Sequence, residues 1–99
     1  MQKFDVLEIG PDLYLVVQAE HLLDLSTVVL LPILPAGVLP ALTQLTIDTR
    51  IGGELYRIRA HMPLTVEAHR VRHLTPVHHL SPDEGQKVMD GLYMIFWGL

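Results

Sequence analysis

Short runs of apolar and alternating residues predict β-strands over the first two-thirds of the chain. Turn-forming residues separate the runs, and Gly10-Pro11-Asp12 predicts a hairpin between the first two. The third run, TVVLLPIL, is apolar at almost every position, which is typical of a strand buried on both faces. The predicted strands cover residues 4–9, 13–20, 27–34, 43–51 and 54–60.

A second hairpin is predicted at Gly52-Gly53, because glycine tolerates positive φ at both positions of a tight turn. On the returning strand Arg57 and Arg59 alternate with Ile58, which places the arginines on one face and the apolar side chains on the other. Residues 64–74, LTVEAHRVRHL, predict a further strand, although their periodicity also fits a helix.

The hydrophobic period changes after residue 80. Ser81-Pro82-Asp83-Glu84 predicts a helix start, with Ser81 as the N-cap and Glu84 closing a capping box. An apolar face follows at helical spacing, formed by Val88, Leu92 and Ile95, and Gly98 ends the helix. We therefore predict a single mainly-β domain over residues 1–99. It is a partly open barrel of short antiparallel strands over about 3–74, with one C-terminal helix over about 82–96 and a tail at 97–99.

The composition limits the classes of function that the protein can have. The net charge of −4 is the wrong sign for a non-specific nucleic-acid binder, so no direct nucleic-acid binding is expected. The hydrophobic fraction of 49% against 18% charged residues leaves apolar surface that a homodimer would bury. No signal peptide opens the chain, and three prolines interrupt the apolar stretch 22–42, so a cytoplasmic protein without membrane association is expected.

The histidines and arginines allow two interpretations each. Were residues 69–73 helical, His69 and His73 would share a face at metal-ligand spacing, whereas in a strand they lie about 13 Å apart. We favour surface histidines and expect no metal or cofactor. The pairs Arg57/Arg59 and Arg70/Arg72 fit either a phosphate-binding strip or a solvated face that pairs with Glu54 and Glu67, and we favour the latter. With no nucleophile elbow or paired carboxylates, an enzyme is not expected.

The last eight residues, LYMIFWGL, carry the most specific signal. The chain resembles the CcdB family of plasmid-addiction toxins, which poison DNA gyrase, in the helix ending Phe96-Trp97-Gly98-Leu99. The opening Met1-Gln2, the stretch LYLVVQAEHLLD, the proline of LLPIL and the close HLSPDEGQKVMDGLYMIFWGL match the family in order. The resemblance implies a homodimer of SH3-like barrels that traps the cleaved-DNA complex through the dimerisation region in the A subunit of DNA gyrase. It also implies a cognate antitoxin with a disordered C-terminal segment.

The resemblance assigns gyrase-binding roles to six positions. It makes Trp97 the wedge, Gly98 its close-approach neighbour and Leu99 the terminal anchor, and it places Leu22 and Leu23 at the same face. Tyr93 falls where the family carries an amide side chain in the gyrase contact.

Two other functions fit the same sequence. A toxin of this barrel class that cleaves RNA, as MazF/Kid-type proteins do, would use Arg57, Arg59, Arg70 or His69 as phosphate clamps or proton carriers. A non-toxic homologue would instead pack its tail inward.

Overall fold

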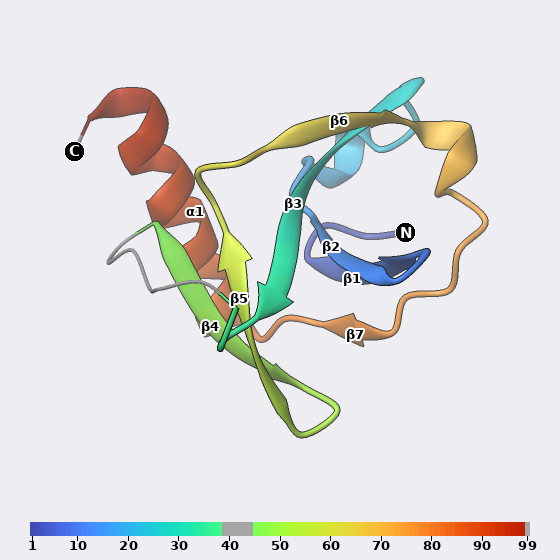
Figure 1. Cartoon of the computed structure of the whole chain (residues 1–99). Helices are drawn as coiled ribbons and strands as arrows, with labels where there is room; N and C mark the ends of the chain where they lie inside the picture. Colours follow the sequence, from blue (N-terminus) through green and yellow to red (C-terminus); the bar gives the residue numbers. More distant parts are fainter. Residues whose placement is uncertain (39–44, 99) are drawn as a thin grey trace.

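The computed structural model describes residues 1–38 and 45–98 as a curled antiparallel sheet with one C-terminal helix (Figure 1). The sheet order is β4-β5-β3-β2-β1-β7, and β6 pairs separately with β3. This confirms the predicted mainly-β, partly open barrel. The strands are β1 (Asp5–Ile9), β2 (Asp12–Val16), β3 (Thr27–Pro35), β4 (Thr46–Ile51), β5 (Glu54–Arg59), β6 (Leu64–Glu67) and β7 (His78–His79). Two short 3₁₀ turns, η1 (Glu20–Leu22) and η2 (Ala68–Arg70), and the helix α1 (Pro82–Trp97) complete the elements.

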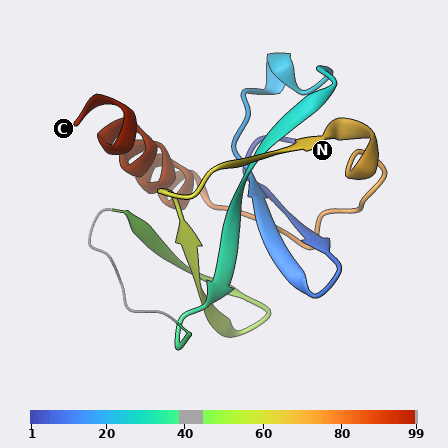
Figure 2. The same cartoon turned by 45° about the horizontal axis from the view of Figure 1, so that its top comes forward.

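Strand β3 organises the sheet. One edge pairs with β2, while the other pairs first with β6 and then with β5, so the sheet bends along this strand (Figure 2). Its alternate residues enter two separate apolar clusters: Leu31 and Ile33 belong to one, Val28 and Leu30 to the other. The prediction that 27–34 is a strand buried on both faces is confirmed.

Helix α1 begins where its sequence predicts and ends within one residue of the predicted position. The Ser81 side chain accepts a hydrogen bond from the Glu84 backbone N–H at 3.2 Å, and Glu84 Oε1 accepts one from the Ser81 backbone N–H at 3.1 Å. The helix ends at Trp97, one residue later than predicted, and Gly98 caps it with a φ of 73°. Val88 is fully buried in the cluster that contains Ile58, which holds the helix against the sheet.

Two predicted strands end several residues before their predicted ends. The strand predicted over 13–20 ends at Val16, because the Gln18 side chain bonds the backbone of Thr27 and Val29 at 3.1 Å each. The strand predicted over 64–74 ends at Glu67, because burial of Ala68 in an apolar cluster turns the chain into η2. The tight turn at Gly52-Gly53 is present, with φ values of 60° and 84°.

Candidate functional site

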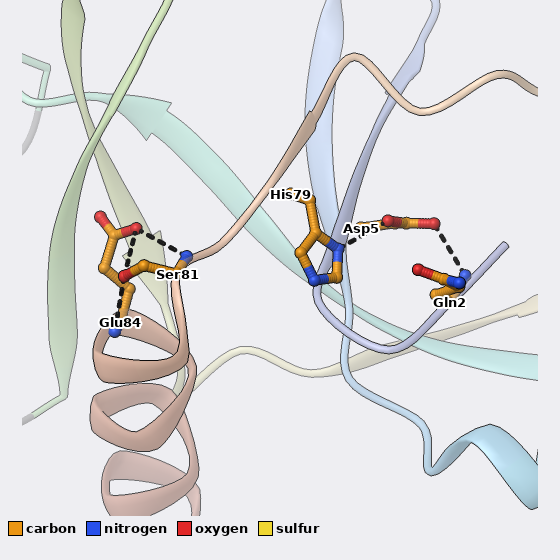
Figure 3. A network of polar contacts seen from close by, with 5 residues as sticks. All are labelled: Gln2, Asp5, His79, Ser81 and Glu84. Atoms are coloured by element: carbon orange, nitrogen blue, oxygen red, sulfur yellow. Dashed lines mark hydrogen bonds and ion pairs between the residues drawn. The ribbon is translucent and has the colours of Figure 1, made fainter.

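A buried carboxylate and a half-exposed imidazole meet where β7 pairs with β1. The antiparallel register places Asp5 opposite His79, and Oδ1 of Asp5 lies 2.8 Å from Nδ1 of His79 (Figure 3). The other carboxylate oxygen accepts a hydrogen bond from the Gln2 backbone N–H at 2.7 Å. Asp5 is only 5% exposed, whereas the His79 side chain is 52% exposed. The carboxylate therefore fixes a ring that remains open to solvent.

Two open hollows include His79 in their lining. One, of about 630 Å³, lies between the N-terminal segment and the start of α1, and its lining includes Lys3, His79 and Gln86. The other, of about 570 Å³, lies toward β4 and its lining includes Arg50, His78 and His79. His79 is therefore common to both hollows, and a chain-like ligand that occupied both would contact it.

Glu84 anchors the wall of the second hollow. Its Oε2 accepts a hydrogen bond of 2.5 Å from Oγ1 of the buried Thr49, while Oε1 is held by Ser81 (Figure 3). Burial alone would raise the pKa of Glu84, but the hydrogen bonds from Thr49 and Ser81 outweigh it, so the pKa lies below its usual value. Glu84 is thus a fixed anion that joins β4 to the start of the helix, rather than a proton donor.

The four arginines do not form the single strip that the sequence allowed. Arg57 Nε pairs with Asp48 at 3.0 Å across β4 and β5, and Arg70 pairs with Glu67 at 3.5 Å three residues earlier in the chain, so both arginines meet carboxylates but only Glu67 is one of the predicted partners. Arg72 donates to the backbone oxygen atoms of Leu23 and Leu25 at 2.8 and 2.9 Å. Arg59 Nη2 contacts Nε2 of His61 at 3.0 Å, and His69 lies 3.6 Å from Glu67.

Histidine metal ligation finds no support in the part of the chain that the structure describes. His69 lies in the short turn η2 and His73 beyond it, so neither the helix nor the continuous strand considered above is formed. Within residues 1–38 and 45–98, no group of three or more histidine, aspartate or glutamate side chains is placed to hold an ion. Over the same residues, no helix has the length and apolar character that crossing a membrane requires.

The residues that the sequence assigned to gyrase binding are not brought together. Tyr93 and Trp97 lie on the last turns of α1, 54% and 68% exposed, with ring centroids 6.0 Å apart. Leu22 is 40% exposed and Leu23 is buried, and the light-blue turn η1, which ends at Leu22, lies well away from the C-terminal end of α1 in both views (Figures 1 and 2). Leu99 falls outside the described residues.

The curled sheet with its C-terminal helix is the fold of several toxin structures. An endoribonuclease from a mycobacterial species matches all of this chain and 92% of its own, with a TM-score of 0.80 at 13% identity. A mycobacterial endoribonuclease in complex with its cognate antitoxin matches all of this chain and 94% of its own, with a TM-score of 0.71 at 15% identity. A MazE–MazF complex from Deinococcus radiodurans gives a TM-score of 0.76 at 11% identity over 98% of this chain and 95% of its own. No family model and no curated protein sequence matches the chain.

These neighbours correct the family expected from the sequence. The likeness is to endoribonuclease toxins of the MazF type, so the expectation of a CcdB-type poison that binds the A subunit of DNA gyrase is wrong. The expectation of a non-enzyme is wrong with it, because the neighbours are endoribonucleases, and their likeness leaves nucleic-acid binding open. The error has a physical source: Phe96 and Trp97 lie at an exposed helix end, where packing of the fold constrains the residues least.

Little in the sequence pointed to the Asp5–His79 pair. The two residues are 74 positions apart, and they meet only through the register of a two-residue strand. The one local signal was an acidic residue at the start of an apolar strand, at a position that proves to be buried.

Proposed function

We propose that this protein is an endoribonuclease toxin that a cognate antitoxin neutralises. The observation that carries the proposal is the fold likeness to a mycobacterial endoribonuclease, which extends over the whole chain with a TM-score of 0.80. The neighbour solved with its cognate antitoxin supports the second half of the proposal. With RNA as its substrate, the protein would act in the cytoplasm.

The chemistry of the β7 surface fits an RNA backbone. Lys3 lines one of the two hollows together with Glu20, and Arg50 and His78 line the other together with Asp48 and Glu84, so each hollow offers cationic groups that phosphates of a passing strand could contact. RNA also supplies its own nucleophile, the 2′-hydroxyl group, so the reaction needs no serine or cysteine from the protein. Because the chain carries a net charge of −4 and both hollows include carboxylates, the attraction would come from individual cationic side chains rather than from the overall charge.

Cleavage of RNA tests the proposal. The purified protein should cut single-stranded RNA and leave DNA of the same sequence intact, because DNA lacks the 2′-hydroxyl group. Arg50→Ala should weaken RNA binding and reduce the slope of log affinity against log salt by about 0.7 to 1. Arg70→Ala is the matched control, since Arg70 is 70% exposed and pairs with Glu67 away from this surface. RNA that stays intact after incubation with the wild-type protein overturns the proposed activity.

We further propose that the protein is a homodimer whose contact includes the aromatic end of α1. Tyr93, Phe96 and Trp97 expose 54%, 67% and 68% of their surfaces, and such an aromatic patch on a monomer is typical of a protein contact. The antitoxin would bind the dimer through a disordered C-terminal segment that orders on binding. Sedimentation of the wild type and of Phe96→Ser/Trp97→Ser tests the dimer: a wild-type protein that sediments as a monomer at micromolar concentration contradicts it.

A further inference from the structure

We propose that Asp5 and His79 form the proton-transfer pair of the candidate site, with His79 as the base that removes the 2′-hydroxyl proton of RNA and Asp5 as its positioning residue. The inference rests on the proposed function and assigns roles within the same site. It follows from the hydrogen bonds of the pair, from the burial of one partner and the exposure of the other, and from the place of His79 in the lining of both hollows.

The hydrogen bonds of the pair determine which ring nitrogen of His79 can accept a proton from the substrate. Both oxygens of the Asp5 carboxylate accept hydrogen bonds, one from the Gln2 backbone N–H and one from the imidazole. The network therefore places the proton of the neutral ring on Nδ1, which leaves the lone pair on Nε2. Within the described residues no hydrogen bond joins Nε2 to the protein, and the ring is half exposed. A base with a free lone pair thus faces the surface on which the substrate would lie.

Burial of Asp5 helps to hold the imidazole of His79 in one orientation. At 5% exposure its carboxylate exchanges hydrogen bonds with water rarely, and the Gln2 N–H prevents it from turning away from the ring. The imidazolium that forms after proton transfer would lie 2.8 Å from this anion, which stabilises the charge at the moment it develops. No other described histidine lies this close to a buried carboxylate: His69 meets the exposed Glu67 at 3.6 Å.

The step balances without any further reactant. The 2′-oxygen attacks the adjacent phosphorus and its proton passes to Nε2 of His79; the P–O2′ bond forms and the P–O5′ bond breaks. The leaving 5′-oxygen takes a proton from water, and His79 later returns its proton to solvent. The products are a 2′,3′-cyclic phosphate and a 5′-hydroxyl group. Lys3 and Arg50 belong to the linings of the two hollows that share His79, where they would hold neighbouring phosphates while the proton moves.

A structural role for the pair must be separated from a catalytic one, because the same contact helps to hold β7 against β1. Asp5→Asn makes this separation. The asparagine oxygen can still accept from the Gln2 N–H, but its amide group would donate to Nδ1 and so move the ring proton to Nε2. The contact between β7 and β1 is kept, but Nε2 of His79 can no longer accept a proton. We therefore expect kcat to fall at least about 100-fold with little change in KM.

The experiment compares His79→Gln, Asp5→Asn and the control His73→Gln, an exposed histidine outside the two hollows. We expect cleavage by His79→Gln to fall at least about 100-fold and to lose the acidic limb of the pH–rate profile that a histidine base produces. His73→Gln should match the wild type. Nitrogen NMR of the ring should show the Nδ1–H tautomer in the wild type and the Nε2–H tautomer in Asp5→Asn.

The outcomes separate this inference from the function on which it rests. A wild-type protein that cleaves RNA and a His79→Gln variant that cleaves it equally well overturn the pair and leave the endoribonuclease intact. If His79→Gln does not fold, the test passes to Asp5→Asn. A folded Asp5→Asn variant that has the Nε2–H tautomer and an unchanged kcat also overturns the pair and leaves the endoribonuclease intact. A folded wild-type protein that leaves RNA intact overturns the proposed function, and the pair with it.

Discussion

The hydrogen bond between Thr49 and Glu84 offers a direct measure of how firmly the helix is joined to the sheet. Thr49 is 3% exposed and its Oγ1 donates to Glu84 Oε2 at 2.5 Å. Thr49→Val keeps the side-chain volume and removes only the donor. A hydrogen bond to a charged group contributes about 1.5–3 kcal/mol, and water can partly replace the hydroxyl at the half-exposed Glu84. We therefore expect the free energy of unfolding at pH 7 to fall by about 1–2 kcal/mol.

The penalty of Thr49→Val should depend on pH with a defined sign. Burial raises the pKa of Glu84, and the bonds from Thr49 and Ser81 lower it by more, so the folded-state pKa lies below the unfolded value of 4.5. A depressed carboxylate pKa contributes stability above the unfolded pKa and loses it as the pH falls through the folded one. The Thr49→Val penalty is therefore full at neutral pH and shrinks as the pH falls below 4.5.

Urea denaturation followed by circular dichroism supplies the measurement, with Glu84→Gln and the double variant completing a cycle. Glutamine can still close the capping box with Ser81, so Glu84→Gln isolates the charge. The coupling energy between the two positions should be about 1 kcal/mol at pH 7. A coupling near zero, or a Thr49→Val penalty that stays constant down to the acid limit of the folded state, would refute the reasoning.

Three further predictions concern α1 and its surroundings. Ser81→Ala removes the N-cap and should cost about 1 kcal/mol in urea unfolding, and an unchanged midpoint contradicts the cap. Gly85→Ala places a Cβ 2.6 Å from Phe4 Cε2, so we expect the free energy of unfolding to fall by about 1 kcal/mol and the Tm with it. The control is Gly37→Ala, where a Cβ meets nothing within 4 Å and the free energy of unfolding should change by no more than about 0.5 kcal/mol. Equal Tm values for the two variants contradict the contact with Phe4. Trp97 is the only tryptophan and 68% exposed, so iodide should quench the fluorescence of the monomer strongly; weak quenching there contradicts this placement.

The features that the sequence predicted well depend on neighbouring residues. The capping box needs only Ser81 and Glu84, three positions apart, and the tight turn needs only Gly52-Gly53. The burial of β3 on both faces followed from its unbroken apolar run. Each of these signals lies within one element, where side-chain chemistry determines the backbone directly.

The features that the sequence did not predict depend on residues far apart or on exposed positions. The contact between Asp5 and His79 requires the register of β7 on β1, which no local pattern specifies. From the sequence, Arg57 could pair with several carboxylates. In the fold it pairs with Asp48, which lies opposite it on the adjacent strand. The tail at Phe96-Trp97 resembled one toxin family, while the fold resembles the structures of another. The choice between them depended on tertiary structure, to which an exposed helix end contributes little.

The 74 positions between Asp5 and His79 also bear on synthesis of the protein. The pair cannot exist until translation has passed residue 79, by which point β1 to β6 have already been made. A truncated product released by a stalled ribosome therefore lacks the pair, however well its earlier strands fold. Fragments that end before residue 79 would therefore lack the proposed base and should not cleave RNA.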